Sequence, residues 1–122
     1  MTEQRAAGAF DFETLRRSIE ERDAETLAGL YAEEAELQVV NRNAPPSTPF
    51  VLRGRGAISD YYEDVCGRAM THRIERAVVG EDRAAFTEAC EYPDGTRVLC
   101  ATMLDVEDGR ITRQTNVDAW DE

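Results

Sequence analysis

The sequence has no lysine, since all 14 of its basic residues are arginine. Without lysine no Schiff base can form on the chain, which excludes pyridoxal phosphate chemistry. The P-loop, which requires Gly-Lys followed by Ser or Thr, is excluded for the same reason. Histidine is nearly absent, and His72 is the only one. Zinc and iron sites built from several histidines therefore cannot form. A magnesium site built from carboxylates alone stays open, but no clustered Asp/Glu motif indicates one, so we expect no metal and no cofactor.

Cysteine is scarce, and its spacing matches no disulfide or zinc motif. The chain has three cysteines, Cys66, Cys90 and Cys100, without a Cys-x-x-Cys pair. This pattern favours reduced, mostly buried thiols in a reducing compartment. The N-terminus has no apolar signal region, and no segment approaches the roughly 20 apolar residues of a membrane span. We therefore expect a cytoplasmic protein.

Positive charge is in deficit, because 25 acidic residues oppose 14 basic ones and give a net charge of -11. Nucleic acids and anionic membranes are bound by basic patches, so we expect neither as a partner. The charge is simply explained as a contribution to solubility. A chain of 122 residues that is 42% apolar is long enough for one domain with its own core.

Three segments have apolar residues at helical spacing. They are a helix over Asp11–Arg22, a short helix that Asp23 caps and that ends with Tyr31, and a helix that follows Gly56. The apolar face of the third contains Ile58, Tyr61, Tyr62, Val65 and Ala69. Residues 1–8 are polar and small and form a loose arm, and residues 9–122 form the single domain.

The rest of the chain predicts strands bounded by turns. The predicted strands are Glu36–Asn41, a short edge strand Phe50–Leu52, and four longer strands, His72–Val79, Ala84–Tyr92, Thr96–Val106 and Arg110–Trp120. This order predicts an α+β fold in which helices cover the apolar face of an antiparallel sheet. Incomplete covering of a curved sheet would leave a pocket between the two layers.

Two Asp-Gly turns set the register of the last three strands. A three-residue loop after Tyr92 pairs Cys90 with Val98, Glu88 with Cys100 and Phe86 with Thr102. The same loop after Val106 pairs Thr102 with Gln114, Cys100 with Asn116 and Val98 with Asp118. A two-residue turn at Asp108-Gly109 is the alternative, and it would turn the last strand's side chains to the opposite face.

The face that carries Phe86 and Cys90 is the more apolar one, so it should meet the helices. Glu88 on this face would be desolvated, which suits a general acid or base. The alternatives are an ion pair with a buried arginine, or exposure on the other face. His72, on one strand face with Ile74 and Val78, is either a second acid/base group or a structural histidine at the pocket rim.

Asp118 and Asn116 on the last strand can orient water or a substrate oxygen, unless that strand is solvated. Tyr31, Tyr61 and Tyr62 either line the pocket as hydrogen-bond donors or only pack. A nucleophilic role of Cys100 is disfavoured, because only His72 is available as its base. The candidate catalytic residues are Glu88, His72 and Asp118, and the candidate pocket residues are Tyr31, Tyr61, Tyr62, Phe86, Cys100, Thr102, Gln114 and Asn116.

Three segments carry a resemblance to a known family: Leu30–Leu37 (LYAEEAEL), Arg53–Ile58 (RGRGAI) and Gly109–Gln114 (GRITRQ). In this order the chain resembles, over nearly its whole length, the SnoaL-like branch of the nuclear transport factor two-like superfamily. The resemblance implies a cone-shaped sheet wrapped around the N-terminal helix, and a homodimer formed through the outer sheet face. It implies cyclisation, isomerisation, dehydration or epoxide hydrolysis, although many members are not catalytic.

The resemblance can be tested position by position. The essential base of the ketosteroid isomerases falls at Val39, their oxyanion-hole acid at Thr102 and their oxyanion-hole tyrosine at Leu15, so we do not expect this activity. Two supporting tyrosines of that site have counterparts in Tyr31 and Tyr62. The last-strand aspartate of the cyclases and epoxide hydrolases falls at Asn116, with Asp118 one step further along the same face.

Two functions remain open. The first is a small cofactor-free enzyme that moves protons with Glu88, His72 and Asp118 on an apolar, oxygenated small molecule. The second is a non-catalytic binding or dimerisation module on the same fold. In that case Glu88 and His72 would belong to structural pairs, and the cavity would be small or filled.

Overall fold

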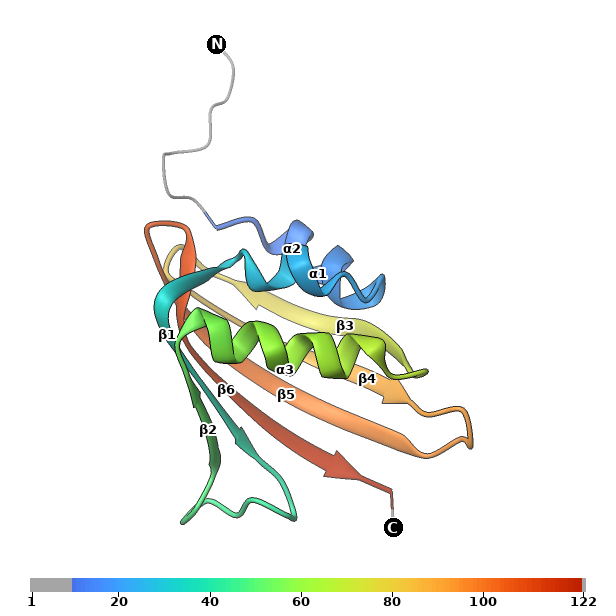
Figure 1. The fold of residues 1–122 in the computed structure, drawn as a ribbon. Helices are drawn as coiled ribbons and strands as arrows, with labels where there is room; N and C mark the ends of the chain where they lie inside the picture. The colour runs from blue at the N-terminus through green and yellow to red at the C-terminus, as the bar shows by residue number, and fades with distance from the viewer. Residues whose placement is uncertain (1–9, 122) are drawn as a thin grey trace.

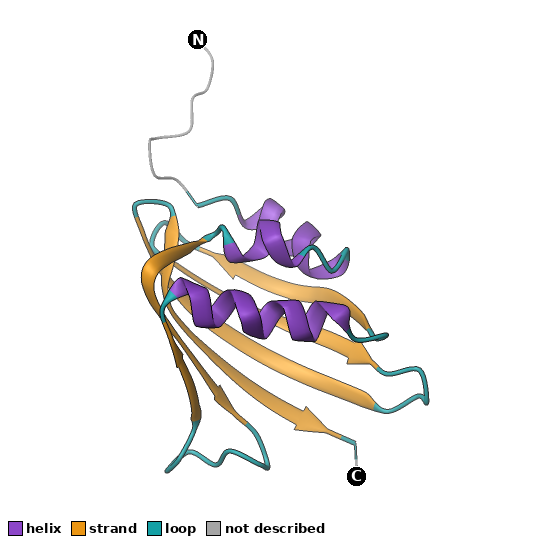
Figure 2. Ribbon diagram, in the orientation of Figure 1, coloured by secondary structure: helices purple, strands orange, loops and turns teal. Residues whose placement is uncertain are grey.

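The protein folds as a strongly curved sheet with three helices on one of its faces (Figures 1 and 2). The structure is a computed structural model, and it describes residues 10–121. The predicted arm, residues 1–8, lies outside the described residues. The arrangement confirms the predicted α+β class.

The helices are α1 (Phe12–Glu20), α2 (Ala24–Ala28) and α3 (Arg55–Gly67). The first two begin as the sequence predicts, because the Asp11 and Asp23 carboxylates accept hydrogen bonds from the backbone N–H groups of Thr14 and Thr26. No helix within residues 10–121 is long and apolar enough to cross a membrane.

The strands are β1 (Tyr31–Val40), β2 (Phe50–Arg53), β3 (Thr71–Val79), β4 (Arg83–Glu91), β5 (Arg97–Glu107) and β6 (Arg110–Trp120). They form one sheet in the order β2-β1-β6-β5-β4-β3. Five predicted strands lie within a residue or two of their observed bounds, and the first one is longer than predicted. The sheet is mixed rather than wholly antiparallel, because β1 runs parallel to β6.

Tyr31 was wrongly assigned to the second helix. That helix ends at Ala28, and Tyr31 opens β1, where it pairs with Ile111 and is fully buried. The backbone N–H of Ile111 also donates to the carbonyl of Leu30 at 2.9 Å. Pairing with a strand 80 residues away in the sequence therefore overrides the local helical spacing.

The first predicted hairpin is confirmed. The N–H of Tyr92 donates to the carbonyl of Thr96 at 2.9 Å across a three-residue loop. Gly95 takes the left-handed conformation that this loop needs, with φ of 93°. Glu88 therefore faces Cys100 as predicted.

The second predicted hairpin is wrong in its turn and in its register. Glu107 pairs with Arg110, so the turn has two residues, Asp108 and Gly109, with φ of 52° and 77°. A turn of this kind alone would reverse the face of β6, but Thr112 is an extra residue between the paired positions Ile111 and Arg113. This bulge reverses the face a second time, which restores the predicted orientation.

The net effect on β6 is a shift of two residues against β5. Asn116 therefore lies opposite Thr102 and Asp118 opposite Cys100, whereas the predicted partners were Cys100 and Val98. Both polar side chains keep the predicted inner face, toward the helices.

A bulge also corrects the prediction for the face of β3. Ile74 pairs with Glu88 and Arg76 with Thr87, which leaves Glu75 without a partner position. The side chains beyond Glu75 change face, so Val78 does not share the face of His72 and is 75% exposed. The regular alternation along the sequence gave no sign of this insertion.

The core lies between the helices and the inner face of the sheet. Its fully buried large side chains come from both layers and include Leu15, Leu37, Ile58, Leu104 and Ile111. Helix α1 packs on β3, and α3 packs on β1 and β2. All three cysteines are free, as predicted, and Cys90 and Cys100 are buried.

The two-residue turn generates a stability prediction. Gly109→Ala should lower the free energy of unfolding by about 1–2 kcal/mol, because an alanine at φ of 77° places its Cβ against the backbone. Gly56→Ala is the matched control. Gly56 lies in α3 with open space around it, so alanine there should stabilise the protein by up to about 1 kcal/mol. Urea unfolding measures both, and equal stability of Gly109→Ala and wild type would contradict the role of the turn.

Candidate functional site

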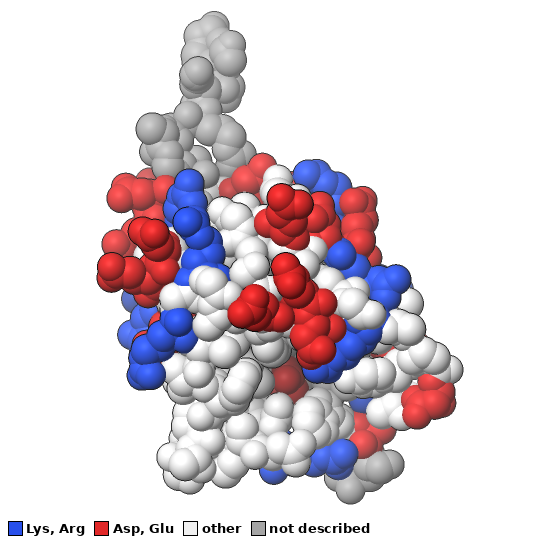
Figure 3. All heavy atoms as spheres, viewed as in Figure 1, with Lys and Arg blue, Asp and Glu red and all other residues white. Residues whose placement is uncertain are grey.

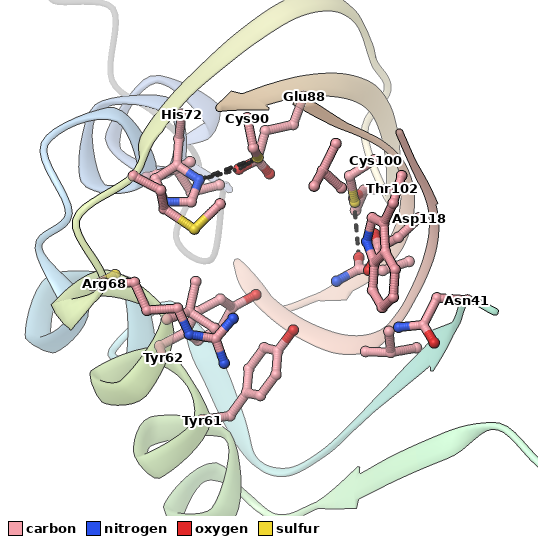
Figure 4. A pocket seen from close by; sticks show the side chains of 18 of the residues that line it. Asn41, Tyr61, Tyr62, Arg68, His72, Glu88, Cys90, Cys100, Thr102 and Asp118 are labelled. Atoms are coloured by element: carbon pink, nitrogen blue, oxygen red, sulfur yellow. Dashed lines mark hydrogen bonds and ion pairs between the residues drawn. The ribbon is translucent and has the colours of Figure 1, made fainter. Parts of the chain in front are cut away.

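A cavity of about 440 Å³ lies between α3 and the inner face of the sheet. It is about the size of pockets that bind small organic molecules. The predicted sheet residues that line it are His72, Phe86, Glu88, Cys100, Thr102, Gln114, Asn116 and Asp118. Figure 4 shows His72, Glu88, Cys100 and Thr102 directed inward from neighbouring strands. The two bulges and the curvature of the sheet thus bring the predicted residues together.

The tyrosines differ in their positions. Tyr61 and Tyr62 on α3 line the cavity, and their hydroxyl groups point into it (Figure 4). Tyr31 does not line the cavity, which corrects the prediction, because it lies wholly in the core. Its hydroxyl group lies 2.8 Å from that of Tyr62, so it supports the cavity wall from behind.

His72, Glu88 and Cys90 form a compact cluster at one end of the cavity (Figure 4). His72 Nδ1 donates to Glu88 Oε2 at 2.8 Å, and the thiol of Cys90 donates to the same oxygen at 3.2 Å. Oε1 of Glu88 has no hydrogen-bond partner among residues 10–121. Glu88 is thus held in place through one oxygen, and the other remains available.

The cluster follows from strand pairing. His72 on β3 lies opposite Cys90 on β4, and Glu88 is two residues before Cys90 on the same face. The His72 and Glu88 side chains are only 4% and 14% exposed. Nε2 of His72 is buried without a hydrogen-bond partner in the described part of the chain. Buried polar atoms without a partner are uncommon in folded proteins.

A second polar group forms a connected network on the floor of the cavity. Tyr31 donates to Gln114 Oε1, and Gln114 Nε2 donates to Asn116 Oδ1 at 2.9 Å. Thr102 donates to the same Asn116 oxygen at 3.0 Å. These contacts fix the amide orientations and satisfy polar groups that would be costly to bury alone. Gln114 and Asn116 therefore form a rigid polar floor of the cavity.

Asp118 lies apart from this network, opposite Cys100. Burial raises the pKa of its carboxyl group, and hydrogen bonds from Cys100 and Asn41 lower it in part. The charge of Glu88 raises it further. No arginine forms an ion pair with Asp118 in the described structure. Asp118 is therefore a carboxyl group that readily holds a proton.

Two tyrosines and two cysteines of the cavity stay neutral. Burial raises the pKa of Tyr61 and Tyr62, and it also raises the pKa of the Cys90 and Cys100 thiols. The tyrosine hydroxyls therefore remain hydrogen-bond donors. Cys100 contacts Thr102 Oγ1 at 3.4 Å rather than His72, so it lacks the base that a nucleophilic thiol needs.

The sequence did not reveal the residues at the cavity mouth. They include Asn41, Arg68, Tyr92 and Trp120. The guanidinium of Arg42 lies over the Trp120 ring at 4.7 Å from its centre. Isolated residues in loops and at strand ends have no periodic signal, so only the folded chain identifies them.

Charge is unevenly distributed around the cavity. Acidic and arginine side chains cover the outer surface of the helices, and uncharged surface gathers below them in Figure 3. Inside the cavity the arginine is Arg68, whose charge is already paired with Asp64 at 2.5 Å. The interior therefore combines apolar walls with two carboxyl groups and several neutral hydrogen-bond donors.

Comparison with known proteins identifies the chain's relatives. The sequence model of the SnoaL-like domain matches residues 12–114. No curated protein matches significantly.

Solved structures share the fold. An NTF2-like protein of unknown function from Mesorhizobium loti is 22% identical, with a TM-score of 0.78 over 98% of this chain and 97% of that one. A Kribbella flavida protein proposed to be a ketosteroid isomerase is 21% identical, with a TM-score of 0.74 over 91% of this chain and 75% of that one. A loop-truncation variant of IdmH is 22% identical, with a TM-score of 0.68 over 88% of each chain. At these identities the likeness concerns the fold.

The environment of Asp118 generates a pH prediction. Its pKa is higher in the folded protein than in the unfolded chain. The folded state therefore binds the proton more tightly than the unfolded chain does. As a result, the stability of wild type relative to the uncharged variant Asp118→Asn is greatest at low pH. That advantage is lost as the pH rises from the unfolded value near 3.8 through the folded pKa. The melting temperature of Asp118→Asn minus that of wild type should increase over this range and then remain constant. A difference that is constant throughout would contradict a raised pKa.

Proposed function

The chain belongs to the SnoaL-like domain family, and from this premise we propose that it is an acid/base enzyme acting on an apolar, oxygenated small molecule without a cofactor. The reaction class is cyclisation, isomerisation, dehydration or epoxide opening. Each of these needs proton transfer in a cavity from which water is largely excluded.

The observation that carries the proposal is the position of Glu88. Its carboxylate borders a cavity of about 440 Å³ and accepts from His72 Nδ1 at 2.8 Å through Oε2, while Oε1 has no hydrogen-bond partner among the described residues. A general base must be fixed in place and able to reach a substrate proton. In this arrangement His72 orients Glu88, and Oε1 abstracts the proton.

Asp118 supplies the complementary acid. Glu88 lies opposite Cys100 on the neighbouring strand, and Cys100 lies opposite Asp118 on the next. The backbone positions of Glu88 and Asp118 are therefore two strand spacings apart, or about 10 Å. A small molecule between them can lose a proton to Glu88 at one end and gain one from Asp118 at the other. The neutral hydroxyl group of Tyr61 would donate to a substrate oxygen, since the Tyr62 proton is used in the contact with Tyr31.

The cavity wall indicates the class of substrate. Apolar side chains such as Ile19, Leu27, Val39 and Phe86 line it, and its one arginine is engaged by Asp64. A molecule with a carboxylate or phosphate would face Glu88 and Asp118 without a free cation to compensate. A neutral hydrocarbon skeleton with one or two oxygens fits this environment.

One observation favours a second candidate, a binding module without turnover. Glu88 and His72 form a close pair, which is also how a structural pair in a non-catalytic member would look. The size of the cavity favours ligand binding in either case. A turnover assay therefore has to accompany a binding assay.

We further propose a homodimer that forms through the outer sheet face. Leu99, Met103 and Val117 on this face are 51%, 60% and 49% exposed. They lie on adjacent strands β5 and β6, so their side chains form a continuous apolar surface. A second copy is the partner that the family resemblance implies for such a surface. The cytoplasmic location expected from the sequence stays a proposal, which the free thiols support.

The catalytic proposal predicts the effect of Glu88→Gln. A thermal-shift screen of neutral epoxides, enones and hydroxylated polycyclic compounds should identify ligands, followed by product analysis for each hit. Glu88→Gln keeps the shape of the side chain but removes the base, so turnover should fall by about 100- to 10,000-fold while ligand binding persists.

The matched control is Glu91→Gln on the same strand, whose side chain is 50% exposed outside the cavity. It should leave turnover unchanged. Ligand binding without turnover by the wild type would instead establish the binding module. Equal turnover of wild type and Glu88→Gln would eliminate Glu88 as the base.

The dimer proposal predicts the effect of a charge at the centre of the outer face. Sedimentation velocity should show a wild-type dimer at micromolar concentration, and Met103→Glu should sediment as a monomer. Met103→Leu keeps the apolar surface and should remain dimeric. A monomeric wild type, or a dimeric Met103→Glu, would disprove assembly through this face.

A further inference from the structure

Cys90 is a buried thiol that the acid/base mechanism does not use, yet it lies at the centre of the site. Its Sγ lies 3.3 Å from His72 Nδ1 and 3.2 Å from Glu88 Oε2, and the last two atoms are 2.8 Å apart. One nitrogen, one sulfur and one oxygen thus form a small triangle at the cavity wall. Within the described residues this is the group of possible ligand atoms that lies close enough to hold a metal ion.

The size of the triangle can be compared with that of a zinc site. Zinc bonds of about 2.0–2.3 Å in tetrahedral geometry place neighbouring ligand atoms roughly 3.3–3.6 Å apart. The observed separations of 2.8, 3.2 and 3.3 Å are shorter by about half an ångström or less. They are the distances of hydrogen bonds that a metal would replace, so small side-chain rotations suffice to open the triangle.

We propose that His72, Glu88 and Cys90 form a binding site for a thiophilic divalent metal ion such as Zn²⁺. Three protein ligands leave the fourth tetrahedral position to water or to a ligand in the cavity. All three residues border that cavity, so the open position faces accessible space.

The donor types determine which ions fit. Calcium and magnesium take oxygen ligands, and this site has only one oxygen donor among three. A thiolate with an imidazole suits zinc and its spectroscopic substitute cobalt. The charges also balance, because a thiolate and a carboxylate together neutralise a divalent ion in a buried position. When the metal binds, the Cys90 proton leaves to the solvent, and the proton on His72 Nδ1 is exchanged for one on Nε2 so that the neutral imidazole binds through Nδ1.

The site is built on rigid elements. His72 and Cys90 are directly paired positions of two adjacent strands, and Glu88 follows on the same face of β4. The backbone therefore fixes all three Cα positions before any metal arrives, which lowers the ordering cost of binding.

Metal binding at this site opposes the proposed acid/base reaction. A metal ion on Glu88 Oε2 withdraws electron density from the carboxylate, and it removes the hydrogen bond by which His72 orients it. The loaded protein therefore loses its general base, and the metal acts as a reversible inhibitor. Metal binding is measured without substrate, so the metal site can be tested independently of the proposed catalysis.

The test is a titration of tag-free, chelator-treated protein with Co²⁺ and Zn²⁺. Co²⁺ should bind with a stoichiometry of one per chain and produce the near-ultraviolet absorption band of a thiolate–cobalt bond. Zn²⁺ should displace it. Cys90→Ser should lose the band and bind Zn²⁺ at least tenfold more weakly, because even residues behind metal ligands change affinity by about 10- to 100-fold.

Cys66→Ser is the matched control, because Cys66 borders the same cavity outside the triangle. It should retain both the band and the Zn²⁺ affinity. Glu88→Gln should keep the band but bind Zn²⁺ more weakly, so it tests the site even if Cys90→Ser is poorly folded. Circular dichroism establishes folding of each variant. Absence of stoichiometric binding by wild type, a band that survives in Cys90→Ser, or its loss in Cys66→Ser would each overturn the proposal.

Discussion

The rest of the site depends on which side chains of β6 point to the inner face of the sheet. This strand lies in the middle of the sheet, between β1 and β5, and it provides Gln114, Asn116 and Asp118 to the cavity. A shift of one residue would move all three to the outer face and would place apolar and polar groups on the wrong sides. The two-residue turn at Asp108-Gly109 and the extra residue Thr112 set this orientation together. The turn alone or the bulge alone would direct these side chains to the opposite face of the sheet. Only the two together keep the polar side chains on the inner face.

Much of this arrangement was accessible from the sequence, because it depends on local signals. Aspartates cap the first two helices, and Gly95 fixes the first hairpin, so Glu88 and Cys100 could be paired correctly. The bulge at Thr112 was not accessible. A bulge adds one residue without changing the kind of residue present, so the alternation of apolar and polar positions does not reveal it. The correct face of Asp118 was therefore predicted with the wrong partner.

The errors at Tyr31 and Val78 have the same origin. Tyr31 follows a helical pattern but is drawn into the sheet by its parallel pairing with Ile111. Val78 alternates with His72 in sequence, but the bulge at Glu75 separates their faces. The contact of Cys90 with His72 depends on pairing across two strands that only the complete sheet defines. Sequence patterns thus located the elements and several residues of the cavity wall, whereas the contacts among His72, Glu88 and Cys90 depended on long-range register.

The polar residues of the cavity divide into a fixed part and an adaptable part. Tyr31, Gln114 and Asn116 are joined by hydrogen bonds and form the floor, while Glu88 and Asp118 border the same cavity outside this network. The hydrogen bonds of the first group fix the shape of the cavity floor. Such a division is expected wherever reactive carboxyl groups have to be held in a largely apolar space.

Trp120 gives the molecule a built-in reporter. It is the one tryptophan of the chain, it borders the cavity, and its ring lies beneath the Arg42 guanidinium. Indole emission depends on the polarity around the ring and on charges above it. A molecule that enters the cavity changes both at a single position, without interference from a second indole. The optical signal of the whole protein is therefore a signal from the mouth of its cavity.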